Sequence, residues 1–224
     1  VTDAYLFTYE QQAPLNELPM AGPDNPVIAV QNGGGIRQNA GDILPQGGTV
    51  PGNITRNDTL NVLAFLTNAI TVVQEVTPED LKQILERAAS NIGGGQFLQI
   101  GGFKVEYDLS LTAQVIETDG TVSTPGSRVI SAVLDDGTRI IDGGAVVAGA
   151  PNVDLVTNSF TAAGGDNYPW LADNPSKVQF PVTYEQAWVE YMLSFPFGIT
   201  GLPTIPATDP RYQPGGEGRI EILN

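Results

Sequence analysis

The sequence contains no cysteine and no histidine among its 224 residues. Without cysteine the chain has no disulfide, no thiolate nucleophile and no thiolate ligand for a metal. Without histidine it has no Ser-His-Asp triad, no imidazole general base and none of the commonest side-chain ligands of transition metals. A dinuclear metallohydrolase normally recruits several histidines together with its carboxylates. We therefore expect this chain to recognise a ligand, with any hydrolytic machinery lying elsewhere.

Basic residues are scarce as well, since 10 Lys and Arg stand against 25 Asp and Glu, a formal net charge of −15. Nucleic acids and anionic membranes are bound through Lys and Arg, so both are disfavoured as partners. The acidic balance is typical of solubility in a salty or extracellular setting. No window approaches 18 uninterrupted apolar residues, so no membrane span is expected. The opening VTDAYLFTYE has no initiator Met and no signal-peptide pattern, which indicates a mature fragment or an excised domain.

The chain does contain enough apolar sequence for a sizeable core, at 41% hydrophobic residues, with 26 Gly and 17 Pro dispersed along it. We expect one domain over residues 1–224, rich in turns. Helices are predicted at 2–12, at 58–65, from Thr77 to the glycines at 93–95, and at 184–193. Strands are predicted at 27–31, 69–76, 97–100, 103–109, 113–117, 129–134, 138–141 and 153–157, with an edge strand in the closing RIEIL. This order favours an α+β fold over a doubly wound parallel sheet.

Helix starts are indicated by capping residues. Thr2 or Asp3 is the expected cap of the first helix, with Ala4, Leu6 and Phe7 on its apolar face. In the third helix Thr77 is the expected cap, Pro78 suits the first turn, and Asp80 stands where a capping box has its acid.

The stretch Gln31-Asn32-Gly33-Gly34-Gly35-Ile36-Arg37 follows a predicted strand and is costly to order, because glycine loses the most backbone entropy on folding. One interpretation is a tight turn that needs positive φ. The other is a close backbone approach to a ligand, with Arg37 offering its forked donors to an anionic or polar group.

Two aromatic residues allow similar alternatives. Phe65 is either a core residue at the end of a helix or an exposed ring that stacks on a base. Phe160, in the stretch NSFTAAGGDNY, is either buried beside a turn or a second stacking ring, with Asp166 accepting hydrogen bonds from ribose hydroxyls.

Together these stretches resemble the C-terminal domain of the 5'-nucleotidases, the family that includes UDP-sugar hydrolase. The resemblance covers nearly the whole chain. It is carried by VTDAYL, NGGGIR, GGGQFLQIGGFKVEYDLS, VTNSFTAAGGDNY and GEGRIEI, in family order. It implies a layered α/β/β/α-type domain of mixed strands and helices.

In that family an N-terminal metallophosphoesterase domain holds two metals and an Asp-His pair, while the C-terminal domain binds the nucleoside and rotates to bring substrate to the metals. The resemblance therefore implies a periplasmic or extracellular nucleotide- or nucleoside-binding domain. It also implies no cofactor in this domain, with divalent metals in a catalytic domain that this chain does not contain. The chain is then part of a 5'-nucleotidase but not catalytic alone.

Carried over by motif, the two stacking rings are Phe65 and Phe160. The sugar and phosphate contacts are Asn32, Gly34, Arg37 and Asp166, with Asn68 as a further base contact. The family usually has Pro-Phe-Gly-Asn at the first ring, whereas this chain has Ala64-Phe65-Leu66-Thr67-Asn68, a turn one residue longer. The loop at 40–53 is also longer than the family pattern, which would reshape the pocket.

Two other functions stay open at this point. A degenerate surface module that keeps the fold for a structural or protein-interaction role is favoured by the altered turn and the longer loop. An autonomous hydrolase would have to use Asp, Glu and a metal without histidine.

Overall fold

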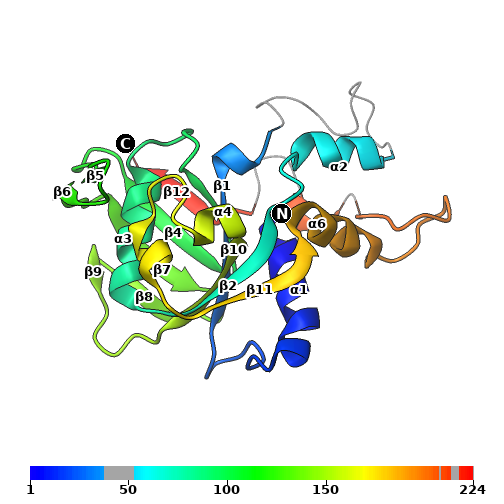
Figure 1. Cartoon of the computed structure of the whole chain (residues 1–224), viewed down its shortest axis with the longest axis horizontal. Helices are drawn as coiled ribbons and strands as arrows, with labels where there is room; N and C mark the ends of the chain where they lie inside the picture. Colours follow the sequence, from blue (N-terminus) through cyan, green and yellow to red (C-terminus); the bar gives the residue numbers. More distant parts are fainter. Residues whose placement is uncertain (38–52, 207, 213–216, 224) are drawn as a thin grey trace.

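The fold is built on two five-stranded sheets, seen in a computed structural model that describes residues 1–37, 53–206, 208–212 and 217–223 (Figure 1). Most of the expected long loop at 40–53 therefore lies outside the described residues. The mixed α+β class is confirmed. Helices α1 and α6 cover one face of the first sheet, and α3 and the second sheet lie on its other face (Figure 1).

The first sheet has the order β11-β2-β10-β1-β3. Its strands are β1 (Val27–Asn32), β2 (Ala69–Val76), β3 (Leu98–Gly101), β10 (Val153–Asn158) and β11 (Lys177–Thr183). The central strands β1 and β10 run parallel, while β2 is antiparallel to β10 and β3 is antiparallel to β1. The carboxyl ends of β1 and β10 therefore meet at the same edge of the sheet where β2 begins.

The second sheet has the order β12-β4-β7-β8-β9. Its strands are β4 (Phe103–Asp108), β7 (Val129–Leu134), β8 (Arg139–Asp142), β9 (Ala145–Val146) and β12 (Ile220–Leu223). The closing strand β12 pairs parallel with β4 at the sheet edge, as its sequence predicts. A separate hairpin joins β5 (Val115–Ile116) and β6 (Val122–Thr124).

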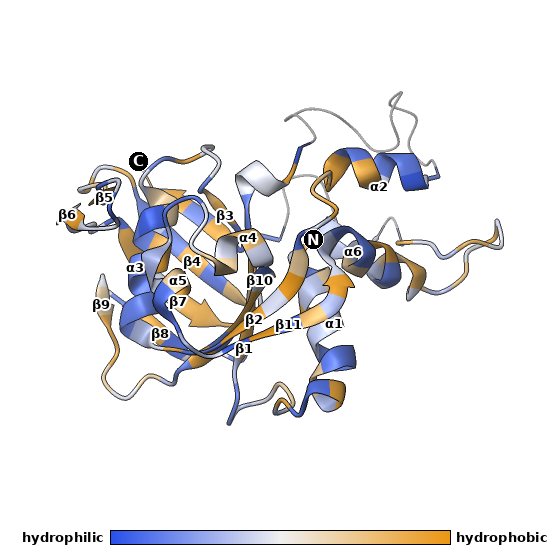
Figure 2. Ribbon diagram, viewed as in Figure 1, coloured by the Kyte–Doolittle hydropathy of each residue, from blue (hydrophilic) through white to orange (hydrophobic). Residues whose placement is uncertain are grey.

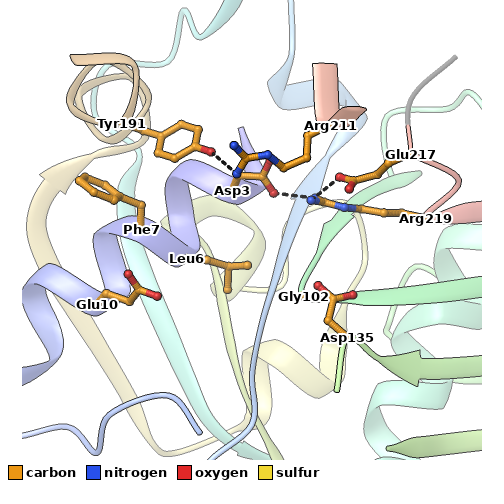
Figure 3. Close-up of a pocket in the computed structure, with 10 residues that line it drawn as sticks. All are labelled: Asp3, Leu6, Phe7, Glu10, Gly102, Asp135, Tyr191, Arg211, Glu217 and Arg219. Atoms are coloured by element: carbon orange, nitrogen blue, oxygen red, sulfur yellow. Dashed lines mark hydrogen bonds and ion pairs between the residues drawn. The ribbon is translucent and has the colours of Figure 1, made fainter. Parts of the chain in front are cut away.

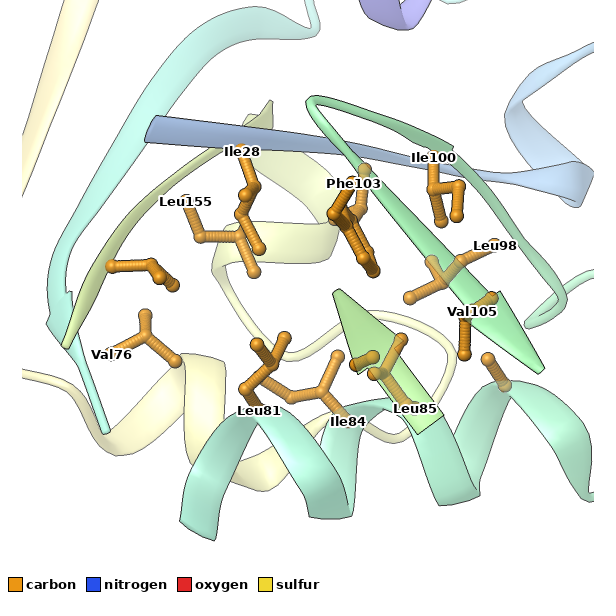
Figure 4. Close-up of a cluster of buried hydrophobic side chains, with 14 of the residues drawn as sticks. Ile28, Val76, Leu81, Ile84, Leu85, Leu98, Ile100, Phe103, Val105 and Leu155 are labelled. Carbon is orange, nitrogen blue, oxygen red and sulfur yellow. The ribbon is translucent and has the colours of Figure 1, made fainter. Parts of the chain in front are cut away.

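The main hydrophobic core lies between the two sheets and is closed by α3 (Pro78–Ala89) (Figure 4). Leu81, Ile84 and Leu85 of α3 point into this core because their 3,4-spacing places them on one face. Alternate residues of β1 face opposite sides, so Ile28 and Val30 enter this core whereas Ala29 does not.

A second core lies on the other face of the first sheet, under α1 (Thr2–Gln12) and α6 (Tyr184–Leu193). Tyr5 and Tyr9 are the large buried side chains of α1. The predicted apolar face is confirmed for Leu6, which is half-buried and packs against this core, but it was wrong for Phe7, whose ring lies beside Tyr191. Both residues line a cavity described below. The hydropathy colours agree, because α1 has little continuous apolar surface (Figure 2).

The remaining helices are short: α2 (Arg56–Val62), α4 (Ser159–Ala162), α5 (Pro169–Asp173), and the 3-10 turns η1 (Ala13–Asn16), η2 (Gly33–Gly35) and η3 (Pro210–Tyr212). Helix α2 begins two residues earlier than predicted because Thr55 and Asp58 form a reciprocal capping box. It ends at Val62, so Phe65 lies beyond the helix in a turn. No helix in the part of the chain that the structure describes is both long and apolar enough to cross a membrane.

The predicted bounds of α1, β2, β7 and α6 are confirmed, and α3 begins after its Thr77 cap as expected. The predicted cap of α1 was wrong, because Val1 occupies the cap position and no side chain caps the helix. Strands β6, β9 and β11 were not predicted. Strand β11 contains Pro181, which is tolerated because the strand lies at the sheet edge, where an N–H can be missing from the ladder.

Candidate functional site

The predicted site residues come together at the edge where β1 and β10 end. Asn32 is the last residue of β1 and Asn158 the last residue of β10, and both are buried. The backbone N–H of Ala69, which begins β2, donates to Ser159 Oγ at 3.2 Å. Segments 32–37, 65–68 and 158–166 are thereby gathered at one sheet edge. In doubly wound α/β sheets ligands bind outside the carboxyl ends of parallel strands, and β1 and β10 form the parallel pair of this mixed sheet.

The three glycines form the turn η2, and none of them has a positive φ. The interpretation as a turn that requires positive φ was therefore wrong. The Gly33 N–H donates to the Phe97 carbonyl at 2.7 Å, and the Gly34 N–H donates to the Gly95 carbonyl at 2.8 Å. A Cβ on Gly33 would lie 3.1 Å from the Gly94 carbonyl oxygen. Glycine is needed because this loop packs directly on a second glycine-rich backbone segment.

Arg37 is exposed at the end of this loop. Its backbone N–H donates to the Val62 carbonyl at 2.8 Å, and its Nη1 donates to the Gly34 carbonyl at 3.0 Å. Its guanidinium carbon lies 5.5 Å from the centre of the Phe65 ring. No carboxylate pairs with Arg37 within the described ranges. The structure therefore brings Arg37 and Phe65 together at this edge.

Phe65 lies in the turn between α2 and β2, and its side chain is 45% exposed. Its N–H donates to the Tyr184 hydroxyl at 2.7 Å, and its carbonyl accepts from the Asn68 N–H at 2.9 Å. Burial raises the pKa of Tyr184, so this hydroxyl stays protonated at neutral pH. Asn68 is half-buried, and its carbonyl accepts from the Tyr184 N–H at 2.8 Å. The backbone of Asn68 thus closes the turn, and its predicted base contact stays a prediction.

Phe160 lies in the first turn of α4 and is also 45% exposed. Asn158 caps this short helix by accepting from the Thr161 N–H at 3.0 Å. The ring packs over Gly165, where any Cβ would collide with it. Both phenylalanines are therefore surface rings on fixed backbone, and the interpretation as buried core aromatics was wrong. Their stacking on a base stays a prediction.

The Asp166 carboxylate is held from the strand side. Its Oδ2 accepts from Asn32 Nδ2 at 2.6 Å. The orientation of the Asn32 amide is fixed in turn, because its Oδ1 accepts from three neighbours at 2.9–3.2 Å: Gln31, Asn158 and Thr161. Asp166 and Asn167 have φ of 60° and 65°, which is uncommon outside glycine. The structure thus brings Asn32 and Asp166 into direct contact, as one shared site requires.

Sequence reasoning missed the residues behind this site, namely Gln31, Asn158, Thr161, Arg87, Tyr5 and Tyr184. The Tyr5 hydroxyl donates to Gln31 Oε1. A usable signal was present, because Gln31, Asn32 and Asn158 are polar residues at the ends of otherwise apolar strands. Their burial at one place can be inferred only when it is known that β1 and β10 are neighbours in the sheet.

No group of three Asp, Glu, Cys or His side chains that could hold a metal occurs in the described part of the chain.

A separate cavity of about 340 Å³ lies beside α1, away from these residues (Figure 3). Within it Arg219 pairs with Asp3 at 2.7 Å and with Glu217 at 2.5 Å. None of the predicted site residues lines this cavity.

An α+β domain with two exposed aromatic rings, a cation and a clamped carboxylate at one sheet edge is suited to recognising a ligand. The chain belongs to the family of the 5'-nucleotidase C-terminal domain, whose pattern matches residues 1–173. The resemblance identified from the sequence is thereby confirmed.

Proteins similar to this chain were found by sequence and by structure. The trifunctional nucleotide phosphoesterase protein YfkN of Bacillus subtilis (strain 168) is 33% identical over 149 residues, which are 63% of this chain and 8% of that protein. The 5'-nucleotidase precursor of Thermus thermophilus superposes with a TM-score of 0.67 at 25% identity, covering 100% of this chain and 34% of that one. The NAD nucleotidase of Haemophilus influenzae shares the fold, with a TM-score of 0.58 at 20% identity over 99% of this chain and 33% of that one. The chain thus spans only about a third of these solved proteins and under a tenth of the curated relative.

Proposed function

We propose that this chain is the nucleotide- or nucleoside-recognition domain of an exported 5'-nucleotidase-type phosphohydrolase, periplasmic or extracellular in location. Its catalytic partner is an N-terminal metallophosphoesterase domain of the same protein, which supplies the divalent metals. The domain itself binds the ligand and, alone, hydrolyses nothing. The family, together with the nucleotide phosphoesterase and 5'-nucleotidase names of its relatives, supports this function.

The observation that carries the proposal is the pair of half-exposed phenylalanines at one sheet edge. Solvent-exposed aromatic rings are the usual platform for a base, because every base offers a π-face. Each ring is backed by rigid backbone, since Tyr184 holds the Phe65 N–H and Gly165 lies under Phe160. A platform that is already ordered loses little entropy when the base stacks on it.

The polar groups complete the ligand site. Arg37 offers donors to a phosphate or another anionic group, and a net charge of −15 makes such an exposed cation valuable for attracting an anion. The Asp166 carboxylate accepts hydrogen bonds from the sugar hydroxyls, and Asn32 beside it offers an amide donor. Gly34 and Asn68 line the same edge through their turns.

The test is titration of AMP and adenosine by calorimetry, with wild type and Phe160→Ala. We expect wild-type Kd values of about 0.1–1 mM, because each stacked ring contributes about 1–3 kcal/mol. The substitution should weaken binding about 5- to 100-fold. Phe197→Ala is the matched control, because Phe197 is 74% exposed and lies in a loop after α6. Equal affinity of wild type and Phe160→Ala would disprove the stacking role.

A second candidate is a degenerate module with a structural or protein-interaction role. It is favoured by an uncharged apolar loop at 196–204 that projects from the body after α6 (Figure 1). The loop is closed by the bridge between Phe197 and Pro203, yet Ile199 is fully exposed at its tip. It also lies outside the segment that matches the family. Absence of any AMP or adenosine binding by wild type would favour this candidate.

A further inference from the structure

Arg87, in the last turn of α3, donates to a backbone carbonyl instead of pairing with an acid. Its Nε and Nη2 both reach the Asp166 carbonyl oxygen, at 3.0 and 2.9 Å. No carboxylate forms an ion pair with Arg87 in the described segments. A half-buried guanidinium normally directs its paired N–H donors at a carboxylate or phosphate. The choice of a backbone carbonyl as the partner of Arg87 therefore needs an explanation.

The explanation is the unusual conformation of the backbone that the Arg87 guanidinium binds. The Asp166 carbonyl belongs to the peptide unit between Asp166 and Asn167, and both residues are in the left-handed region. Asp and Asn enter this region more readily than other non-glycine residues, but as single residues, so two in succession need support from surrounding contacts. The neighbouring turn supplies part of this restraint, because the Asn167 and Tyr168 N–H groups both donate to the Gly164 carbonyl at 3.1 Å. Arg87 holds the same peptide unit from the helix side.

The conformation of this peptide unit decides where the Asp166 carboxylate points. With Oδ2 bound to Asn32 at 2.6 Å, the other oxygen, Oδ1, has no hydrogen-bond partner in the described residues. A change of the Asp166 backbone torsions away from their positive φ would move the carboxylate relative to Asn32. Arg87 therefore acts on the carboxylate without touching the place where a ligand would lie.

We propose that Arg87 is a positioning residue that presents the Asp166 carboxylate to the sugar hydroxyls, an inference that rests on the proposed nucleoside-binding function. Its effect passes through Asp166 alone. Loss of the fork therefore weakens ligands that carry 2'- and 3'-hydroxyls and spares ligands that lack them.

The experiment compares adenosine with 2',3'-dideoxyadenosine in four proteins: wild type, Arg87→Lys, Asp166→Ala and the double variant. Lysine keeps the positive charge but lacks the fork. We expect Arg87→Lys to weaken adenosine binding about three- to tenfold, as for the loss of one ordered hydrogen bond, and to change dideoxyadenosine binding less than about twofold. In the Asp166→Ala background the lysine substitution should have no further effect on adenosine.

Arg139→Lys is the matched control, because Arg139 is exposed in the second sheet and pairs with Asp142. If Arg87→Lys does not fold, as judged by circular dichroism, Arg87→Gln replaces it with the same expectations. The inference is overturned if the Arg87 variant binds adenosine like wild type, loses both nucleosides equally, or adds its effect to that of Asp166→Ala. Failure of wild type to bind either nucleoside overturns the proposed function instead, and this inference with it.

Discussion

Two polar regions of this domain differ in what their charged groups already bind. In the cavity beside α1 the Arg219 guanidinium is shared between Asp3 and Glu217 (Figure 3). The Tyr212 hydroxyl also donates to Asp3, at 3.2 Å. At the carboxyl ends of β1 and β10, the Arg37 guanidinium contacts a backbone carbonyl and the Phe65 ring, and it pairs with no carboxylate among the described residues. Arg219 of the cavity already has two carboxylate partners.

The comparison teaches that a cavity is not by itself the place of recognition. A ligand entering the cavity beside α1 would have to displace existing ion pairs, which costs about as much as the new contacts return. A ligand at the sheet edge meets rings and a cation that have given up part of their hydration without gaining a charged partner. This difference favours the edge as the place of the proposed recognition and a structural role for the cavity.

The largest effect is expected from Arg219→Met, which tests the structural role of the cavity. Arg219 has 18% of its side chain exposed and also donates to the Ile100 carbonyl at 3.1 Å. Its loss leaves Asp3 and Glu217 without their cation, and should lower the free energy of unfolding by about 2 kcal/mol, less than for a fully buried pair. Urea unfolding measures this change. Arg139→Met, in an exposed pair, should cost under about 0.5 kcal/mol.

Adenosine binding by folded Arg219→Met should equal that of wild type. Wild-type stability of this variant would contradict the structural role of the cavity. Loss of adenosine binding by the folded variant would contradict the placement of recognition at the edge.

An intermediate effect is expected from Gly165→Ala, which tests the recognition edge. The added methyl would collide with the Phe160 ring and turn it out of its stacking position. We expect adenosine affinity to fall about tenfold. The free energy of unfolding should change by less than about 1 kcal/mol, because Gly165 is half-buried in a surface loop and its φ is not positive.

Calorimetric titration and urea unfolding of the same Gly165→Ala sample separate the two effects. Gly22→Ala is the control, because a Cβ there meets nothing within 4 Å. Unchanged affinity of Gly165→Ala would show that the position of the Phe160 ring does not matter.

The smallest effect is expected at Asp154, which lies near the start of β10, at the opposite end of the strand from the recognition edge. It tests whether the hydrogen bonds of Asp154 serve only to stabilise the fold. Asp154 accepts from the Glu75 N–H at 3.1 Å and from the Tyr9 hydroxyl at 3.2 Å. Burial raises the pKa of Asp154 above its usual value. The folded state therefore binds this proton more tightly than the unfolded state does, and the stability from Asp154 falls as pH rises through the raised pKa.

Thermal unfolding between about pH 3.5 and 7 should show this loss in wild type and a flatter profile in Asp154→Asn. Asp136→Asn is a control of opposite sign, because hydrogen bonds from Thr138 lower the pKa of Asp136, whose stabilisation is lost as pH falls. Parallel profiles for wild type and Asp154→Asn would contradict the prediction.

Much of the secondary structure was predictable because its signals are local. The bounds of β2 and β7 follow from β-branched runs, and α3 from Thr77, Pro78 and 3,4-spaced leucine and isoleucine. Strand β11 was missed because Pro181 argues against a strand unless the strand is known to be an edge. The face of α1 was only partly predicted because its large buried residues are tyrosines, whose hydroxyls find partners only in the folded chain.

The sequence predicted which residues meet at the candidate site, but not which residues hold them in position. Arg37, Phe65, Phe160 and Asp166 were identified by motif, and the sheet order gathers them at one edge. Arg87 carries no motif, and its fork to Asp166 spans 79 positions of the chain.

The sequence by itself determined which chemistry is absent, since a chain without histidine or cysteine has no imidazole or thiolate to use. It also determined where most elements begin and end, because periodicity and capping act within a few residues. Only the tertiary structure decided why the glycines at 33–35 are needed and which rings face solvent. Only the fold brings Asn32 to Asp166, 134 positions away. The reason is that strand order sets such contacts, and strand order depends on burial of the whole core.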